Sequence, residues 1–432
     1  MSASAATLVG LPTTIFSRLC LFSSCSDLVC LIRTCKVLRS VFEPILWSRV
    51  EWLPCTAHET STIARSRDGT ILHRPQYQMI ETTRPDQLLE RCQLAAQSWF
   101  NKLSQLHSKA PSRTQELCAH TRFLSAPIGN LSKGVQRPDD VCAYATLSYF
   151  SNLVVLELTV DWQPHKSSTF SVPAPGAFPK LSRIKLYGYV PQQLVQCILS
   201  DSSPLQDIDI GLLDEPIPGE EYASRRLGSP VTDDVQQNNL DVDDLMLFPD
   251  NVAPRPLVWF PDAGTSFPFL SYLRLCRPTE MDPSEFVWGR IHHSVRAEVA
   301  CLEGWARLLE VVSPTIQHLV LDQRPVAHED ALEGGSSDEF MRFYSQPSSR
   351  RSLDMLGRLL REVEFPCLSR IDLAGVLTKE PLSSVDEQLR LHIVDLCHEK
   401  QIALHFSLSK RCIFYTEDGV VYSGEGMGAE SL

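Results

Sequence analysis

The residue types best suited to chemistry at the start of the chain are four cysteines spaced by five: Cys20, Cys25, Cys30 and Cys35. Zinc-binding hairpins place two cysteines only two to four residues apart. None of the fourteen cysteines forms a C-x-x-C pair, and His292 with His293 has no further ligand at a suitable spacing. We interpret the cysteines as small, reduced, buried residues, with metal binding as the alternative. The sequence predicts no metal site and no cofactor.

Catalytic motifs are missing from the sequence as well. It has no G-x-S-x-G elbow, no P-loop, no G-x-G-x-x-G after a strand pattern and no H-E-x-x-H. The glycines of Gly419 to Leu432 lack the preceding strand and following helix of a phosphate-binding loop, so we expect a frayed terminus there. We predict that the protein is not an enzyme, with an unrecognised enzyme as the alternative.

Composition narrows the class of protein further. Forty basic and 52 acidic residues give a net charge of −12, which argues against binding to nucleic acid. The most apolar early stretch, 19–32, is interrupted by serines and Asp27, so it predicts no membrane span. No basic residue precedes the first apolar run, and Arg18 lies inside it, so we expect no signal peptide. We expect an intracellular protein, cytoplasmic or nuclear, that contacts no membrane.

The most informative pattern is a repeated L-x-x-L-x-L motif, which predicts strands. Several copies follow a proline, which fixes φ and ends the preceding element. The copies span 153–158, 181–186, 205–210, 270–275, 316–321 and 368–373, with a variant at 402–406.

Amphipathic helices are predicted between these strands, at 192–199, 298–312, 353–363 and 385–398. Such βα units must stack on one another to bury their faces. The pattern resembles leucine-rich repeats, although the spacing between copies is irregular. The predicted fold class is therefore α/β, an irregular leucine-rich-repeat-like solenoid, with a less regular α/β sheet as the alternative.

Alternate strand positions should share the face that is not packed against helices. This face is unusually rich in charged and aromatic residues, for which we weigh a solvated surface against a docking site for a protein substrate. The predicted substrate-binding residues are Arg183, Lys185, Tyr187, Asp207, Asp209, Tyr272, Arg274, His318, Arg370 and Asp372. Val155, Glu157, Thr159, Val320, Asp322 and His405 belong to the same predicted face.

The first 50 residues follow a different pattern. They begin with Leu11-Pro12, continue with Asp27-Leu28 and Cys35-Lys36, and end with Pro44-Ile45-Leu46-Trp47. This ordered set resembles an F-box, a three-helix unit that docks on a Skp-type adaptor. The segment carries five basic and two acidic residues, and the family's adaptor is acidic, so charge should assist docking. The predicted adaptor-binding residues are Leu11, Pro12, Ile15, Leu19, Leu28, Leu31, Leu46 and Trp47.

These patterns divide the chain into an F-box (1–50), a helical linker (51–138), a repeat domain (139–410) and a C-terminal tail (411–432). Within the repeat domain, 214–262 has eleven acidic residues, three arginines and seven prolines, which favours a disordered loop or a segment that folds on binding.

The resemblance implies the substrate-recognition subunit of a Skp-cullin-F-box ubiquitin ligase, with an unknown protein substrate. The alternatives are a repeat scaffold without a link to ubiquitination, and an ordinary helical cap in place of the F-box.

Overall fold

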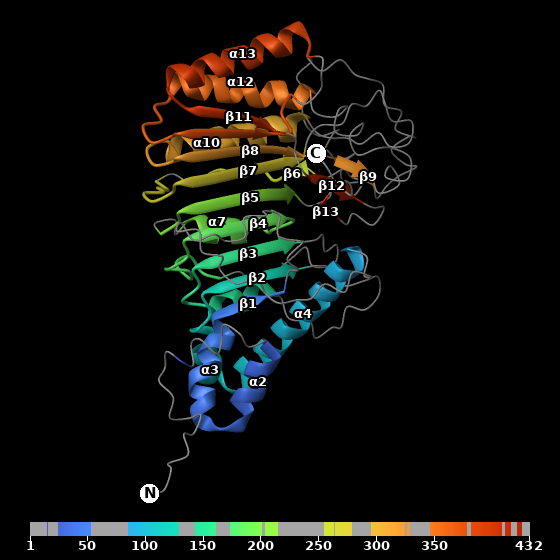
Figure 1. The fold of residues 1–432 in the computed structure, drawn as a ribbon, viewed down its shortest axis with the longest axis vertical. Coiled ribbons are helices and arrows are strands. Elements are labelled where there is room, and N and C mark those ends of the chain that lie inside the picture. Colours follow the sequence, from blue (N-terminus) through green and yellow to red (C-terminus); the bar gives the residue numbers. More distant parts are fainter. Residues whose placement is uncertain are drawn as a thin grey trace, which may run out of the picture. The chain divides into compact units, whose positions relative to one another are not determined.

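The protein is a mixed α/β chain in the computed structural model (Figure 1). Its compact parts group into two units, residues 1–158 with 168–183, and residues 159–167 with 184–432. The structure describes residues 15, 25–52, 85–128, 143–160, 173–200, 204–214, 255–262, 264–278, 295–324, 326–328, 346–377, 382–407, 411–415 and 421–425.

The first unit begins with a pair of packed helices, α2 (Cys25–Thr34) and α3 (Lys36–Ser48). The Sγ of Cys35 caps α3 by accepting from the backbone N–H of Leu38. Leu28, Leu38 and Phe42 form the buried core of the pair. The sequence pattern 27–47 is therefore a helical hairpin stabilised by its own apolar contacts.

The rest of the first unit joins this pair to short parallel strands. The long helix α4 (Pro85–Lys109) lies within the expected helical linker, and it buries Ala96, Phe100 and Leu103. Arg113 of α5 forms an ion pair with Glu43 of α3 at 2.5 Å. The strands follow the order β1-β2-β3, and β1 pairs parallel with β2. The bounds are β1 (Arg49–Glu51), α4 (Pro85–Lys109), α5 (Pro111–Cys118), β2 (Phe123–Ile128), α6 (Ala143–Thr146), the 3₁₀ helix η2 (Leu147–Tyr149) and β3 (Val155–Val160).

The second unit contains the remaining predicted strands in chain order, β4-β5-β7-β8-β10-β11, and the pairs from β5 to β11 are parallel. Strands β3, β4, β5, β7, β8 and β10 each start at the third residue of an L-x-x-L-x-L copy, which confirms the motif as a strand signal. The bounds are β4 (Arg183–Gly188), β5 (Asp207–Asp214), β7 (Tyr272–Pro278), β8 (His318–Arg324), β10 (Arg370–Ala374) and β11 (Ala403–Ser407).

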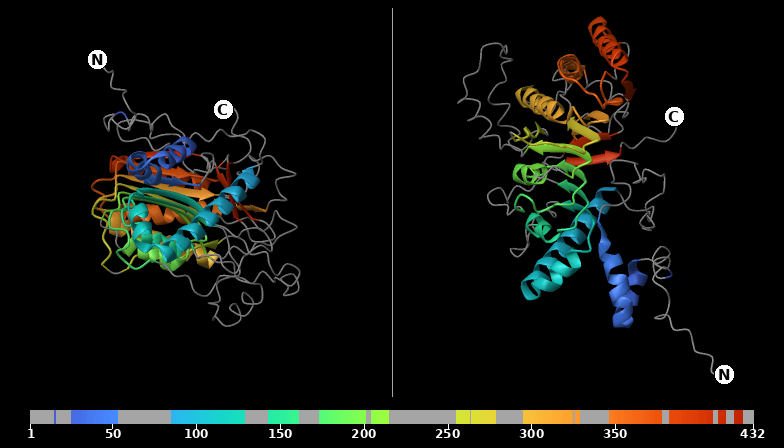
Figure 2. Two further views of the ribbon diagram at one scale, coloured as in Figure 1. Left: turned by 90° about the horizontal axis from the view of Figure 1, so that it is seen from below. Right: turned by 90° about the vertical axis from the view of Figure 1, so that its left-hand side faces the viewer.

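The four predicted helices of this unit are also present: α7 (Gln192–Ser200), α10 (Val295–Val312), α12 (Gln346–Glu362) and α13 (Ser384–Glu399). They lie on one face of the strands, and α10, α12 and α13 pack in succession (Figure 2). The leucines and isoleucines of the motifs face these helices, as the burial of Leu273, Leu275, Leu319 and Leu321 shows. The other face of the strands is free of helices α7 to α13.

Three expectations from the sequence are wrong in part. The stretch 51–138, expected to be a helical linker, contains strand β2, and strand β1 ends at its first residue. The end of the supposedly disordered segment 214–262 is packed, because β6 (Arg255–Pro256) pairs with β5 and Trp259 is buried. The expected frayed tail forms β12 (Arg411–Tyr415) and β13 (Val421–Glu425), which make a three-stranded sheet with β9 (Val326–His328). Backbone pairing with neighbouring strands orders β6, β12 and β13.

The packing of residues 255–262 on α10 can be tested at Gly304. A Cβ at this position would lie 2.4 Å from the carbonyl oxygen of Trp259. Gly304→Ala should therefore lower the free energy of unfolding by about 1–3 kcal/mol, despite the gain of about 1 kcal/mol in helix propensity. Gly357→Ala is the matched control, because its Cβ would meet only side-chain atoms, the flexible tip of Ile393 at 3.1 Å and His392 at 3.9 Å. Equal denaturant midpoints for the two variants would contradict the packing.

Candidate functional site

Parallel register aligns the open-face residues of β5, β7, β8 and β10 in rows across the second unit. The first row contains Asp207, Tyr272, His318 and Arg370. The second row contains Asp209, Arg274, Val320 and Asp372, and it reaches His405 on β11. Because side chains alternate along each strand, both rows lie on the face away from the motif leucines.

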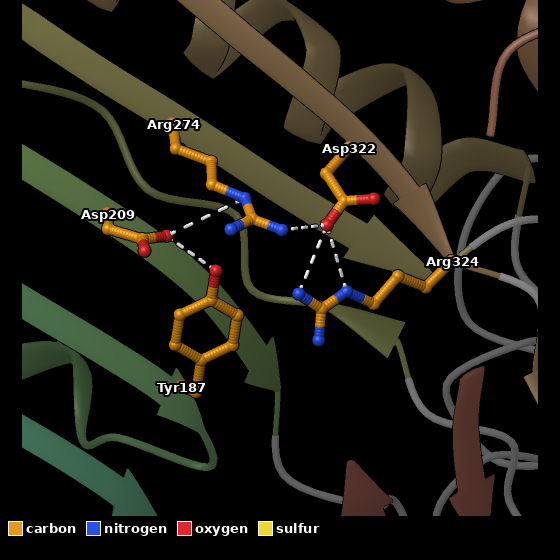
Figure 3. A network of polar contacts seen from close by, with 5 residues as sticks. All are labelled: Tyr187, Asp209, Arg274, Asp322 and Arg324. Atoms are coloured by element: carbon orange, nitrogen blue, oxygen red, sulfur yellow. Dashed lines mark hydrogen bonds and ion pairs between the residues drawn. The ribbon is translucent and has the colours of Figure 1, made fainter. Parts of the chain in front are cut away.

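A network of ion pairs and hydrogen bonds occupies the centre of this face (Figure 3). Tyr187 donates its hydroxyl to Asp209 at 2.5 Å, and the Nε of Arg274 lies 4.0 Å from the same carboxylate. The other side of the Arg274 guanidinium donates to Asp322 at 2.6 Å. Arg324 donates to the same oxygen of Asp322 through two nitrogens at 3.0 Å, and its guanidinium lies over the Tyr187 ring. Four strands are thus connected through two carboxylates.

The surroundings of Arg274 and Tyr272 shift the pKa values of both side chains upward. Burial acts to lower the pKa of Arg274, but Tyr187, Asp209 and Asp322 together raise it above its usual value. Burial, with Asp209 as the next contribution, raises the pKa of Tyr272. The arginine therefore stays charged and the phenol stays protonated near neutral pH. Such groups can donate hydrogen bonds to a partner.

A second and more exposed cluster lies on β7, β8 and β10. His318 Nε2 is 2.7 Å from Asp372, which also accepts from Arg370 Nε at 2.9 Å. The Tyr272 ring meets the His318 ring edge-on, with 5.1 Å between their centroids. Burial acts to raise the pKa of Asp372, but the hydrogen bonds from Arg370 and His318 lower it overall. Half of the Arg370 side chain is exposed, so this cluster can be reached from solvent.

The amino-terminal part of the predicted face is basic. Arg183 and Lys185 are each partly exposed on β4, and Lys185 Nζ lies 5.9 Å from the Tyr187 ring centroid. On β3, Val155, Glu157 and Thr159 are also partly exposed. The sequence identified these positions from alternation alone.

The leucine motif gave no signal for Arg324, because this residue lies beyond the copy that marks β8. The motif does not predict the network on the opposite, helix-facing side of the strands either. There Arg277 donates to Glu298 of α10 and to Ser352 of α12, and Arg351 donates to Glu298 at 2.7 Å. Burial acts to raise the pKa of Glu298, but Arg277 and Arg351 bring it down to about 2. A signal was present in the sequence, since Arg277 occupies a position where alternation predicts an apolar residue.

The predicted adaptor-binding residues have different environments. Ile15 is exposed, whereas Leu28 lies in the core of the α2–α3 pair, with Leu31 and Leu46 packed against that core. The ring centroids of Trp47 and Trp99 lie 6.1 Å apart. Leu11, Pro12 and Leu19 lie outside the described residues.

Two exposed features of this pair are also suited to a partner. Val37 is 45% exposed on α3, although it is apolar. The basic side chains of Arg33, Lys36 and Arg39 are exposed around it.

Comparison with known proteins gives no family. No protein family matches the sequence, and no curated protein is significantly similar to it. No group of three or more His, Cys, Asp or Glu side chains in the described stretches could hold a metal ion. No helix within those stretches is long and apolar enough to cross a membrane.

The central network should be more important for stability than the exposed cluster. Asp322→Ala would leave Arg274 and Arg324 buried without their shared carboxylate, so we expect a loss of about 3–5 kcal/mol in the free energy of unfolding. Arg370→Ala removes an ion pair that is half exposed and should cost less than about 1 kcal/mol. Chemical denaturation of both variants measures the difference. Similar losses would show that the network contributes no more than a surface pair.

Proposed function

We propose that the protein is the substrate-recognition subunit of a Skp-cullin-F-box ubiquitin ligase, and that it is not itself an enzyme. In this proposal the α2–α3 region is part of an F-box that docks on a Skp-type adaptor and, through it, a cullin. The strands of the second unit form a leucine-rich-repeat-like solenoid whose open face holds a protein substrate. The observation that carries the proposal is the alignment of aromatic and charged residues in rows on this face.

The open face has the composition of a protein-binding surface. Tyrosine and arginine are enriched at interface hot spots. On this face Tyr272 packs edge-on against His318, and the half-exposed Arg370 is held by Asp372. Groups that are already ordered lose less conformational entropy on binding. A merely solvated face would not need such fixed side chains, so the geometry favours recognition of a folded or extended protein.

The α2–α3 pair supports the adaptor part of the proposal. Its apolar core is small, and Val37 remains exposed beside basic residues. An acidic adaptor surface would attract these charges and could cover the exposed valine. Leu28 would then act by holding the two helices together, and Ile15 and Val37 would be closer to the partner than Leu28 is.

The adaptor interaction can be tested by charge reversal on the two helices. Arg33→Glu combined with Lys36→Glu should reduce the association rate constant for a purified Skp-type adaptor by about tenfold at low ionic strength, because electrostatic steering is lost. Surface plasmon resonance measures this rate.

Lys102→Glu on the exposed face of α4 is the control for that measurement and should leave the rate unchanged. No binding by the unmodified protein would reject the F-box and leave the interaction scaffold as the proposed function. Unchanged rates in the double variant would reject the proposed basic surface.

The substrate face can be tested independently at β4. Arg183→Glu combined with Lys185→Glu should reduce recovery of substrate proteins by about tenfold or more, because two partly exposed cations at the predicted interface are reversed. Quantitative affinity purification with mass spectrometry measures recovery, and adaptor binding and thermal stability should be unchanged. Lys180→Glu, in the exposed turn before β4, is the matched control. Full recovery of the same partners by the double variant would place the substrate site elsewhere.

A further inference from the structure

Helix α13 is the last helix in the described part of the second unit. No described helix packs against the side of α13 that is opposite α12. Ile393 and His392 face α12, since a Cβ on Gly357 would lie 3.1 and 3.9 Å from their side chains. Asp386 binds Arg350 of α12 at 2.6 Å. Figure 2 shows α13 at the end of the row of helices, beyond α12. The side of α13 opposite α12 therefore faces outward.

A regular stripe of residues runs along this outward side. Glu387, Leu391, Val394 and His398 follow one another at spacings of four, three and four, which places them on one line of an α-helix. All four are exposed, and Leu391 and Val394 are 51% and 39% exposed. Two adjacent apolar residues are thus flanked by an acidic residue at one end and a histidine at the other.

The stripe is complementary to itself in the antiparallel direction. Leu391 and Val394 are equally distant from the midpoint between residues 392 and 393, and so are Glu387 and His398. A two-fold axis through that midpoint would place Leu391 of one copy against Val394 of the other. The same axis would place Glu387 against His398 at both ends. Antiparallel pairing also brings the positive end of each helix dipole near the negative end of the other.

We propose that α13 is a self-association surface, on which a second copy of this chain packs its own α13 antiparallel around a two-fold axis. The interface is isologous, so each contact occurs twice and the assembly closes as a dimer. The neighbouring strand β11 is the last in the described strand order, and the interface would extend that end of the second unit.

The size of the surface sets the expected strength. A helix of 16 residues is about 24 Å long, so one helix pair buries less than the roughly 1,200 Å² of a standard interface. We therefore expect a weak dimer with a dissociation constant on the order of 10 µM. This inference does not depend on the proposed ligase function, since it concerns a different element and a different partner.

Sedimentation velocity of the full chain between about 1 and 100 µM tests the proposal, because this range brackets the expected dissociation constant. Leu391→Asp combined with Val394→Asp should raise the dissociation constant at least about tenfold. Val299→Asp is the matched control, because Val299 is a similarly exposed apolar residue on α10 and should not change association. Circular dichroism checks that each variant remains folded.

A charge exchange tests the antiparallel arrangement itself. Glu387→Lys alone should weaken the dimer, and adding His398→Glu to the same chain should restore it, because the opposite charges are again paired across the axis. Both residues are exposed, so these variants should fold. A protein that stays monomeric over the whole range would overturn the proposal. A dimer unaffected by the Leu391 and Val394 changes, or not restored by the exchange, would overturn it as well.

Discussion

The structure of the second unit depends on backbone pairing that begins just before each strand. The carbonyl of Gln206 accepts the N–H groups of both Ser271 and Tyr272, and the carbonyl of Ser271 accepts those of Gln317 and His318. The carbonyl of Gln317 repeats this pattern with the residues that start β10. A slip by one residue would break these bonds and turn the motif leucines away from the helices. Register is therefore fixed, and the position of every open-face side chain follows from it.

Fixed register determines the electrostatics of the open face. Carboxylates on β5 and β8 lie on either side of Arg274, so opposite charges alternate across these three strands. Buried Arg274, Asp322 and Arg324 pair with one another within this network. Arg370 and the basic side chains of β4, by contrast, are at least partly exposed to solvent. The centre of the face therefore stabilises its own geometry, while its two margins are better placed to bind a partner.

The fold was predictable where apolar side chains determine the structure. Seven strands and four helices of the repeats followed from leucine spacing, because burial of those leucines drives their formation. Strand β2 was missed, since Thr121 and Ala126 stand where a copy of the motif would carry leucines. Alternation correctly separated the two faces of each strand. It could not predict that Arg274 pairs with Asp322, 48 residues away, because that contact depends on which strands become neighbours.

The network on the helix side explains how the open face keeps its shape. Apolar helix–sheet contacts tolerate small shifts, because dispersion and burial have little directionality. Arg277 on β7, by contrast, must reach Glu298 on α10 and Ser352 on α12 together, which allows only one placement of both helices. A buried ion pair of this kind adds little net stability but discriminates strongly against other arrangements, since an unpaired buried charge is costly. In the aligned strands, Arg277 is next to Cys276, whose register partner is Asp322. The ends of β7 and β8 therefore hold the helices on one side and the charged network on the other. A change in helix packing would move these strand ends and so alter the candidate binding face.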